Sequence, residues 1–317
     1  MAKGKAVISG GAGFIGSHLA DSLLRRGWEV LAIDRIRPEQ ASNIGHLAGD
    51  DRFSYAANDL KDQRSVERLT ESSDMIFHLA ANSDIRKGQK DPGIDLKDTF
   101  LTTVSMLEAA RTNEVKKFFF ASTSAVYGDL RGVKLREDTG CLAPISYYGA
   151  YKLASEAAIS SYSYMNGMGS LVFRFPNVVG PRLTHGVIFD FIEKLRTDPK
   201  RLEILGDGRQ SKQYVYVKDL TEAIADFSSA MESGHEVYNI STESFTTVNE
   251  IADMVCEKLG LTDVAYEHTG GDRGWKGDVP SFDYDVEKAK RIGWRYNYDS
   301  SGAVKKTLED LDISFGR

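Results

Sequence analysis

The stretch VISGGAGFIGSHLADSLLRRGWEVLAID, residues 7–34, decides the fold of this chain. An apolar run leads into three glycines, Gly10, Gly13 and Gly16, and a helical segment follows them. A second apolar run then ends at Asp34, 18 residues after Gly16. Glycines let the backbone turn tightly and approach a pyrophosphate at a helix N-terminus, and a carboxylate at the end of the next strand can bind ribose hydroxyls. The order of strand, turn, helix, strand and acid therefore predicts a dinucleotide-binding site.

The acidic residues near this stretch bear on which dinucleotide binds. The charge of Asp34 would repel the 2′-phosphate of NADP, whereas Arg35 and Arg37 lie close by in sequence and oppose that preference. A further acid, Asp59, follows a third strand in the segment NDLKD, where it can face the adenine or be a solvated loop residue. The pattern favours NAD as the cofactor.

Short apolar runs alternate with helical segments through the first half of the chain. The runs typical of buried strands are residues 6–9, 30–34, 75–80, 118–122 and 170–175. The helical segments between them include residues 14–26, 92–112 and 149–166. Apolar strands that alternate with helices indicate a parallel sheet covered on both faces. The predicted fold class is α/β, with a Rossmann-type doubly wound parallel sheet.

The second half of the chain has shorter elements. Glycine-rich turns occur at residues 205–210 and 268–278, and helices are expected near residues 187–197, 218–231 and 247–259. This change predicts a smaller C-terminal α/β lobe packed against the main sheet.

Composition excludes several classes of partner. Of 317 residues, 41% are hydrophobic and 27% charged, and the formal net charge of −6 gives no reason to expect a nucleic acid or an anionic membrane. The two cysteines, Cys141 and Cys256, lie far apart and form no metal-ligand pattern, which favours a reducing compartment. The N-terminus shows no signal peptide and no apolar run reaches membrane-spanning length. We expect a cytoplasmic protein without a metal.

A second stretch, PISYYGAYKLASE at residues 144–156, has the composition of a helix that begins after Ser146. Residues four apart share a helix face, so Tyr148 lies over Lys152 while the neighbouring tyrosines point elsewhere. An ammonium beside a phenol favours the phenolate and lowers the pKa of the tyrosine, which would make Tyr148 a usable base. The same spacing also occurs by chance on amphipathic helices.

Taken together, five ordered motifs resemble the extended short-chain dehydrogenase/reductases that act on nucleotide sugars, in particular their NAD-dependent epimerases. They are the glycine trio, HLAA at 78–81, Tyr148-x-x-x-Lys152, RFPNVVGPR at 174–182 and GDGRQSKQYVYVKD at 206–219. The resemblance covers nearly the whole chain. It implies a Rossmann domain for NAD over residues 1–175, completed by about 213–242, and a nucleotide-sugar lobe over 176–212 and 243–317.

The resemblance also implies roles for individual residues. Tyr148 matches the catalytic tyrosine, Lys152 its partner on the nicotinamide ribose, and Thr123 the hydroxyl that binds the reacting sugar oxygen. The implied cofactor-binding residues are Gly10, Gly13, Phe14, Ile15, Gly16, Asp34, Asp59, Leu60, Leu79, Ala80, Ala81, Tyr148 and Lys152. The implied substrate-binding residues are Arg86, Thr123, Asn177, Val187, Gln210, Lys212, Arg273, Asp278 and Phe282. His78 is expected to be a packed strand residue.

The residues after Thr123 discriminate between reactions of the family. The 4,6-dehydratases carry an Asp-Glu pair there and the decarboxylases of nucleotide-linked uronic acids a Glu, whereas this chain has Ser124 and Ala125. What remains is hydride transfer, which suffices for epimerisation at C4 through a 4-keto intermediate. The expected substrate is a nucleoside-diphosphate hexose or hexuronate, with UDP as the nucleotide.

Several positions depart from the family pattern. Thr99 stands in place of an Asn, Lys212 in place of an Arg, and Arg273 lies two residues further from Asp278 than usual. Lysine neutralises a phosphate as a point charge and not as a fork. Other positions have structural alternatives, since Arg86 can be a solvated loop residue, Asn177 a turn residue, and Phe282 either a wall of the sugar pocket or lobe packing.

Three functions stay open at this point. The leading one is a nucleotide-sugar 4-epimerase, and the second is a nucleotide-sugar oxidoreductase or dehydratase of the same family. The third is a catalytically silent protein that binds NAD and signals through a partner, against which the intact Thr123, Tyr148 and Lys152 argue. The resemblance further implies a homodimer formed through the helices near 92–112 and 149–166.

Overall fold

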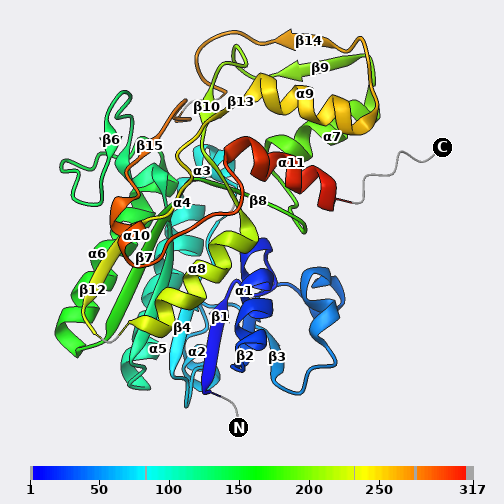
Figure 1. Ribbon diagram of the computed structural model, residues 1–317. Helices are drawn as coiled ribbons and strands as arrows, with labels where there is room; N and C mark the ends of the chain where they lie inside the picture. Colours follow the sequence, from blue (N-terminus) through cyan, green and yellow to red (C-terminus); the bar gives the residue numbers. More distant parts are fainter. Residues whose placement is uncertain (1–2, 83, 232, 275–276, 312–317) are drawn as a thin grey trace. The chain divides into compact units, whose positions relative to one another are not determined.

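Figure 1 shows the computed structural model of the chain, in which residues 3–82, 84–231, 233–274 and 277–311 are described. The chain divides into two compact units. Unit 1 comprises residues 1–128, 139–174 and 221–238, and unit 2 comprises residues 129–138, 175–220 and 239–317. Residues 129–138 and 213–220, which the sequence grouped with the Rossmann domain, therefore fall in unit 2.

Unit 1 is built on a seven-stranded sheet with the order β12-β7-β5-β4-β1-β2-β3. Its strands are β1 Lys5–Ser9, β2 Glu29–Asp34, β3 Phe53–Ala57, β4 Met75–His78, β5 Lys117–Thr123, β7 Gly169–Phe175 and β12 His235–Asn239. Strand β1 pairs in parallel with β2 and β4, β2 with β3, and β4 with β5. The strand order reverses direction beside β1, as a doubly wound sheet requires. The predicted fold class is confirmed.

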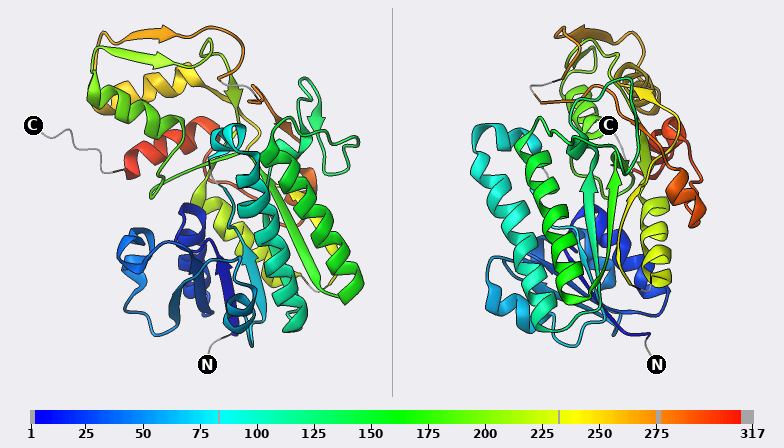
Figure 2. Two further views of the ribbon diagram at one scale, coloured as in Figure 1. Left: turned by 180° about the vertical axis from the view of Figure 1, so that it is seen from behind. Right: turned by 90° about the vertical axis from the view of Figure 1, so that its left-hand side faces the viewer.

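Helices cover both faces of this sheet. They are α1 Phe14–Arg25, α2 Gln63–Leu69, α3 Ile85–Lys90, α4 Pro92–Asp95, α5 Leu101–Thr112, α6 Tyr147–Asn166 and α8 Val217–Ala230. Figure 2 shows α5 and α6 against one face and α1 with α8 against the other. Ion pairs from Arg25 to Glu222 (2.5 Å) and from Arg26 to Asp226 (2.7 Å) join α1 to α8.

One predicted helix contains a π-helical turn. The segment expected to be continuous over 92–112 forms α4, then a π-helical turn η3 at Leu96–Phe100, and then α5. Thr99 is buried within η3, and its carbonyl accepts hydroxyl hydrogen bonds from Thr102 (3.1 Å) and Thr103 (2.7 Å). Its own hydroxyl accepts the backbone N–H of Asn82 at 3.1 Å. These side-chain bonds compete with the regular helical ladder, and helical periodicity alone does not reveal them.

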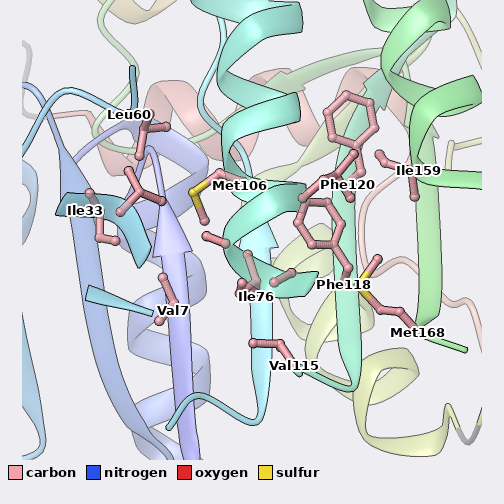
Figure 3. Close-up of a cluster of buried hydrophobic side chains, with 14 of the residues drawn as sticks. Val7, Ile33, Leu60, Ile76, Met106, Val115, Phe118, Phe120, Ile159 and Met168 are labelled. Carbon is pink, nitrogen blue, oxygen red and sulfur yellow. The ribbon is translucent and has the colours of Figure 1, made fainter. Parts of the chain in front are cut away.

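The core of unit 1 lies between the sheet and the helices α5 and α6 (Figure 3). Each contributing element supplies side chains that are almost completely removed from water. From the strands come Val7, Ile33, Ile76, Phe118 and Phe120, and from the helices Met106 and Ile159. Strands buried on both faces need such continuous apolar runs, which explains why the sequence signal for them was strong.

Unit 2 combines short strands with amphipathic helices. Its elements are β6 Lys134–Leu135, β8 Asn177–Val179, α7 Val187–Thr197, β9 Arg201–Ile204, β10 Ser211–Lys212, β11 Tyr214–Tyr216, β13 Thr246–Thr247, α9 Val248–Leu259, β14 Ala265–His268, β15 Asp283–Tyr284, α10 Glu287–Arg291 and α11 Ser300–Asp310. The strands pair two by two, as β10–β13, β11–β8, β14–β9 and β15–β6. Leu195 of α7, Val255 of α9 and Val304 of α11 belong to one buried apolar cluster.

Across the described parts of both units, no helix has the combination of length and apolar character that crossing a membrane requires.

Candidate active site

The glycine-rich turn between β1 and α1 leaves no room for side chains. A Cβ on Gly16 would lie 2.2 Å from the carbonyl oxygen of Gly10, and one on Gly10 would lie 2.8 Å from the backbone nitrogen of Ala80. Gly10 also has a φ of 72°, in the region that favours glycine. Helix α1 starts after Gly13, which makes no side-chain cap, and its first turn holds no acid. Its N–H groups therefore fit the pyrophosphate of a dinucleotide.

The other predicted cofactor residues lie close to this turn or on the neighbouring strand ends. Half-buried residues flank the turn on both sides: Phe14, Ile15, Leu79, Ala80 and Ala81. Asp34 ends β2, where its carboxylate accepts the N–H of Ile36 at 3.3 Å and burial raises its pKa. Asp59 is exposed and accepts the N–H of Lys61 at 3.0 Å, while Leu60 is buried. The exposure of Asp59 leaves both of its sequence interpretations open.

The three predicted catalytic residues come together within unit 1. Thr123 ends β5, and Tyr148 and Lys152 lie one turn apart on α6, which Ser146 caps by accepting the N–H of Gly149 at 3.1 Å. The Thr123 hydroxyl is close enough to the Tyr148 phenol to favour its ionised form, and Lys152 Nζ lies 5.8 Å from the centre of the Tyr148 ring. The predicted N-cap is confirmed, and the helix places Tyr148 and Lys152 on one face.

Gly149 explains how α6 reaches the end of β5. A Cβ at this position would lie 2.6 Å from the carbonyl oxygen of Ala125. Because α6 can approach Ala125 only without that atom, a glycine next to Tyr148 brings the phenol to Thr123.

The expectation that the pKa of Tyr148 is lowered is wrong in this structure. Burial raises the pKa of Tyr148, the charge of Asp95 adds to this, and the nearby Thr123 hydroxyl only partly opposes it. Lys152 Nζ donates instead to the carbonyl of Ala121 at 2.6 Å and lies 4.4 Å from the centre of the Phe120 ring. Burial also lowers the pKa of Lys152 to about 7, against the charge of Glu156. Two buried groups therefore both resist ionisation.

Replacing this lysine should change how stability depends on pH. We expect Lys152→Met to raise the free energy of unfolding of the nucleotide-free protein at neutral pH. The pKa of Lys152 is about 7 in the folded protein, against an ordinary value of 10.5. Between these two pH values the unfolded chain binds more protons than the folded one. The free energy of unfolding of the wild type therefore rises with pH across this window. The advantage of Lys152→Met should therefore shrink across that window. Urea unfolding at pH values below, within and above it measures this, and a pH-independent difference would contradict the lowered pKa.

A buried ion pair in the same unit as the predicted catalytic residues was not predicted from the sequence. Arg174 Nη2 lies 2.6 Å from the carboxylate of Glu156, and both side chains are about 5% exposed. Glu156 also accepts the hydroxyl of Ser122, and Arg174 donates to the hydroxyl of Tyr127 at 3.0 Å. The sequence does place Glu156 four residues after Lys152, on the helix face that Tyr148 and Lys152 share. Only the fold shows that the partner of Glu156 is on β7.

Two further buried groups lie in the same unit. Asp95 is fully buried, with one oxygen accepting the amide of Asn82 at 2.9 Å and the other without a hydrogen-bond partner among the described residues. His78 bonds to Ser9 through Nδ1 (2.6 Å) and to Thr103 through Nε2 (3.0 Å), and burial lowers its pKa to about 3. His78 is therefore neutral and packed, as expected.

Within unit 2, three predicted substrate residues form one cluster. Lys212 Nζ donates to one oxygen of the Asp278 carboxylate at 2.6 Å, and the N–H of Gly274 donates to the other at 3.2 Å. Arg273 donates to the Asp278 carbonyl at 2.8 Å and pairs with Asp129 at 2.5 Å. Despite its shift in sequence, Arg273 thus lies beside Asp278 and Lys212, and two cations gather at one place.

The remaining predicted substrate residues are distributed over several elements. Asn177 is exposed at the start of β8, Val187 begins α7, and Phe282 is half-buried just before β15. Gln210 is buried, and its amide oxygen lacks a hydrogen-bond partner among the described residues. Arg86 belongs to α3, but its side chain lies outside the described residues.

Comparison with known proteins decides the family. The model of the NAD dependent epimerase/dehydratase family matches residues 6–241. The chain belongs to this family. NAD is therefore its cofactor, in agreement with the uncapped α1 terminus and the glycine turn. No group of three His, Cys, Asp or Glu side chains suited to a metal ion occurs in the described ranges.

Relatives of this epimerase/dehydratase chain span nearly its whole length. A putative UDP-glucose 4-epimerase of Methanocaldococcus jannaschii is 30% identical over 95% of this chain and 96% of its own. A crystal structure of a UDP-galactose 4-epimerase has a TM-score of 0.83 and 37% identity, covering 96% of this chain and 98% of its own. The NAD complex of the UDP-glucose 4-epimerase of Thermus thermophilus has a TM-score of 0.84 and 30% identity, with the same coverage of 96% and 98%.

Proposed function

We propose that this protein is an NAD-dependent 4-epimerase of a nucleoside-diphosphate hexose or hexuronate, with UDP as the nucleotide. The observation that carries the proposal is the assembly of Thr123, Tyr148 and Lys152 in unit 1 without an acid at the two positions after Thr123. Ser124 and Ala125 follow Thr123 in the turn η4, Ser124–Tyr127, where a dehydratase of this family would need carboxylic acids. The similarity to proteins named as UDP-sugar 4-epimerases supports the same reaction.

In this proposal the three catalytic residues have different roles at the C4 oxygen of the sugar and at the cofactor. Tyr148 takes the proton of the C4 hydroxyl, and Thr123 holds the same oxygen by a hydrogen bond. Lys152 binds the ribose beside the nicotinamide, and its positive charge then faces the phenolate. Bound NAD supplies reversible hydride transfer at C4, so that no net redox change occurs. After the 4-keto sugar has turned over, the hydride returns to the opposite face of C4 and Tyr148 returns the proton to O4, which completes the inversion.

In this proposal each unit binds one of the two ligands. Unit 1 holds NAD through its glycine turn and Asp34. Unit 2 holds the nucleotide sugar, whose diphosphate competes with Asp278 for Lys212 and with Asp129 for Arg273 and is neutralised by both cations. Asp278 orients both of these residues and is proposed to bind the nucleotide ribose.

Incubation with a panel of nucleotide sugars tests the reaction. The panel comprises UDP-glucose, UDP-galactose, UDP-glucuronic acid and UDP-N-acetylglucosamine, and NMR reads out inversion at C4 without added reductant. Interconversion of one C4 pair supports the proposal. Release of free NADH would identify an oxidoreductase, loss of the C6 oxygen a dehydratase, and NAD binding without any turnover a silent NAD-binding protein.

The sugar pocket gives a prediction about specificity. Phe282 follows Asp278 by four residues, and its half-buried ring is proposed to wall the pocket against a 2-N-acetyl group. Phe282→Ser should therefore raise activity on an N-acetylhexosamine substrate relative to the plain hexose, because removal of the ring leaves space for the acetamido group. Ratios of kcat/KM for the two substrates measure this. Equal wild-type efficiency on both would show that Phe282 does not exclude the group.

The assembly state gives another prediction. Large apolar side chains are exposed on α5 and α6: Leu101 (44%), Tyr147 (50%), Tyr164 (89%) and Met165 (77%). We propose that these helices form the interface of a homodimer. Met165→Glu should weaken the dimer in sedimentation velocity, whereas Phe189→Glu on α7, which replaces a side chain that is 41% exposed, should not. An unchanged mass for Met165→Glu would place the interface elsewhere.

A further inference from the structure

Three separate segments of unit 1 converge on one carboxylate. Arg35, which follows β2, donates to Oδ2 of Asp98 at 2.9 Å. Lys61, which follows β3, donates to Oδ1 of Asp98 at 2.8 Å. Asp98 itself lies in η3, the π-helical turn before α5. Both oxygens of the carboxylate are thus engaged, each by a cation from a different strand end.

The carboxylate is the inner member of this group. The side chain of Asp98 is 21% exposed, against 66% for Arg35 and 41% for Lys61. Burial raises the pKa of Asp98, but the hydrogen bonds from Lys61 and Arg35 outweigh it and leave the pKa below its ordinary value. Asp98 is therefore ionised at neutral pH, when it draws both cations toward itself.

The two cations belong to the adenosine end of the cofactor site. Arg35 directly follows Asp34, and Lys61 lies two residues after Asp59 and 3.5 Å from its carboxylate. Basic side chains next to the acid at the end of the second strand are the groups that accommodate the 2′-phosphate of NADP. A cation already bonded to a carboxylate has to break that bond before it can bind a phosphate.

We propose that Asp98 is a specificity-determining residue of the cofactor site, which favours NAD over NADP by withholding Arg35 and Lys61 from a 2′-phosphate. This role is separate from that of Asp34, which repels the phosphate directly. It also explains how the site can prefer NAD although Arg35 lies next to Asp34, because Asp98 neutralises the arginine. The inference rests on NAD as the cofactor and not on the reaction at C4.

A competition experiment tests this without turnover. The purified protein is equilibrated with equal concentrations of NAD and NADP, freed of unbound nucleotide and denatured, and the released nucleotides are quantified. Because wild type should release almost only NAD, the variants are also made in an Asp34→Ala background, where bound NADP becomes measurable. In that background Asp98→Asn should raise the ratio of bound NADP to NAD about tenfold, the value of one charge-assisted hydrogen bond to a phosphate.

Matched variants separate this role from a general charge effect. Adding Arg35→Gln to Asp98→Asn should remove most of the gain, since the released arginine is then absent. Glu39→Gln removes the same charge from an exposed residue four positions after Arg35 and should leave the ratio unchanged. Thermal unfolding confirms that each variant is folded before its ratio is compared.

An unchanged ratio in folded Asp98→Asn would overturn the proposal. So would a gain that persists in full when Arg35→Gln is added, or an equal gain in Glu39→Gln. None of these outcomes depends on C4 inversion. The proposed function is therefore tested separately, by the nucleotide-sugar panel.

Discussion

Tyr148→Phe should lose nearly all turnover while NAD and the nucleotide sugar still bind. The substitution removes one hydroxyl, the group that interacts with Thr123 and is proposed to take the C4 proton. A positioned acid–base group contributes about 10²–10⁴-fold to the rate, and we expect a loss at the upper end of that range because no second base is proposed. The ring stays in place between α6 and the end of β5, so binding should change little.

The neighbouring tyrosines are the controls for this experiment. Tyr147 is 50% exposed and Tyr151 packs against Phe100 with ring centres 6.4 Å apart, so Tyr147→Phe and Tyr151→Phe should keep most activity. Initial rates at saturating substrate give kcat, and the NAD content of each purified variant shows whether the cofactor site is intact. Near-wild-type turnover in Tyr148→Phe, or loss of activity in Tyr151→Phe, would show that Tyr148 is not the base.

Arg174→Met should be among the most destabilising substitutions in the chain. Arg174 makes three bonds to the carboxylate of Glu156, at 3.1, 3.2 and 2.6 Å, and both side chains are buried. Removing one partner of a buried ion pair leaves an uncompensated charge and costs about 3–5 kcal/mol. Urea unfolding should therefore show a loss of that size, which is a large share of the stability of an ordinary domain.

Two comparisons make this prediction specific to the buried charge. Adding Glu156→Gln should recover much of the loss, because the stranded carboxylate is then neutral. Arg196→Met breaks an exposed pair with Glu193, 2.8 Å apart, and should cost less than about 1 kcal/mol. If Arg174→Met costs no more than Arg196→Met, the buried pair contributes nothing beyond a surface ion pair.

Features with a local physical cause could be predicted from the sequence. The runs at 6–9 and 118–122 became β1 and β5 because strands buried on both faces must be apolar throughout. Ser146 became the cap of α6 because its side chain can accept an N–H three residues on. Gly16 is a glycine because a Cβ there would meet the preceding turn.

Other features depend on partners that are distant in the chain. The π-helical turn within the 92–112 helix involves Asn82, and the raised pKa of Tyr148 involves burial and Asp95, none of which periodicity reveals. Arg273 lies two residues from its usual place in the motif, yet its side chain still donates to the carbonyl of Asp278. The sign of each charge could therefore be predicted from the sequence, but the residue with which it pairs could not.

The sequence by itself determined the order of strands and helices, the cofactor turn and the Tyr148–Lys152 face, because each follows from spacing along a single element. Only the tertiary structure decided which charges neutralise one another. Arg35 and Asp98 are 63 positions apart, and Arg174 and Glu156 belong to a strand and a helix that meet only in the folded protein. Electrostatic interaction depends on distance and burial, and both are set by packing across the sheet and not by position in the chain.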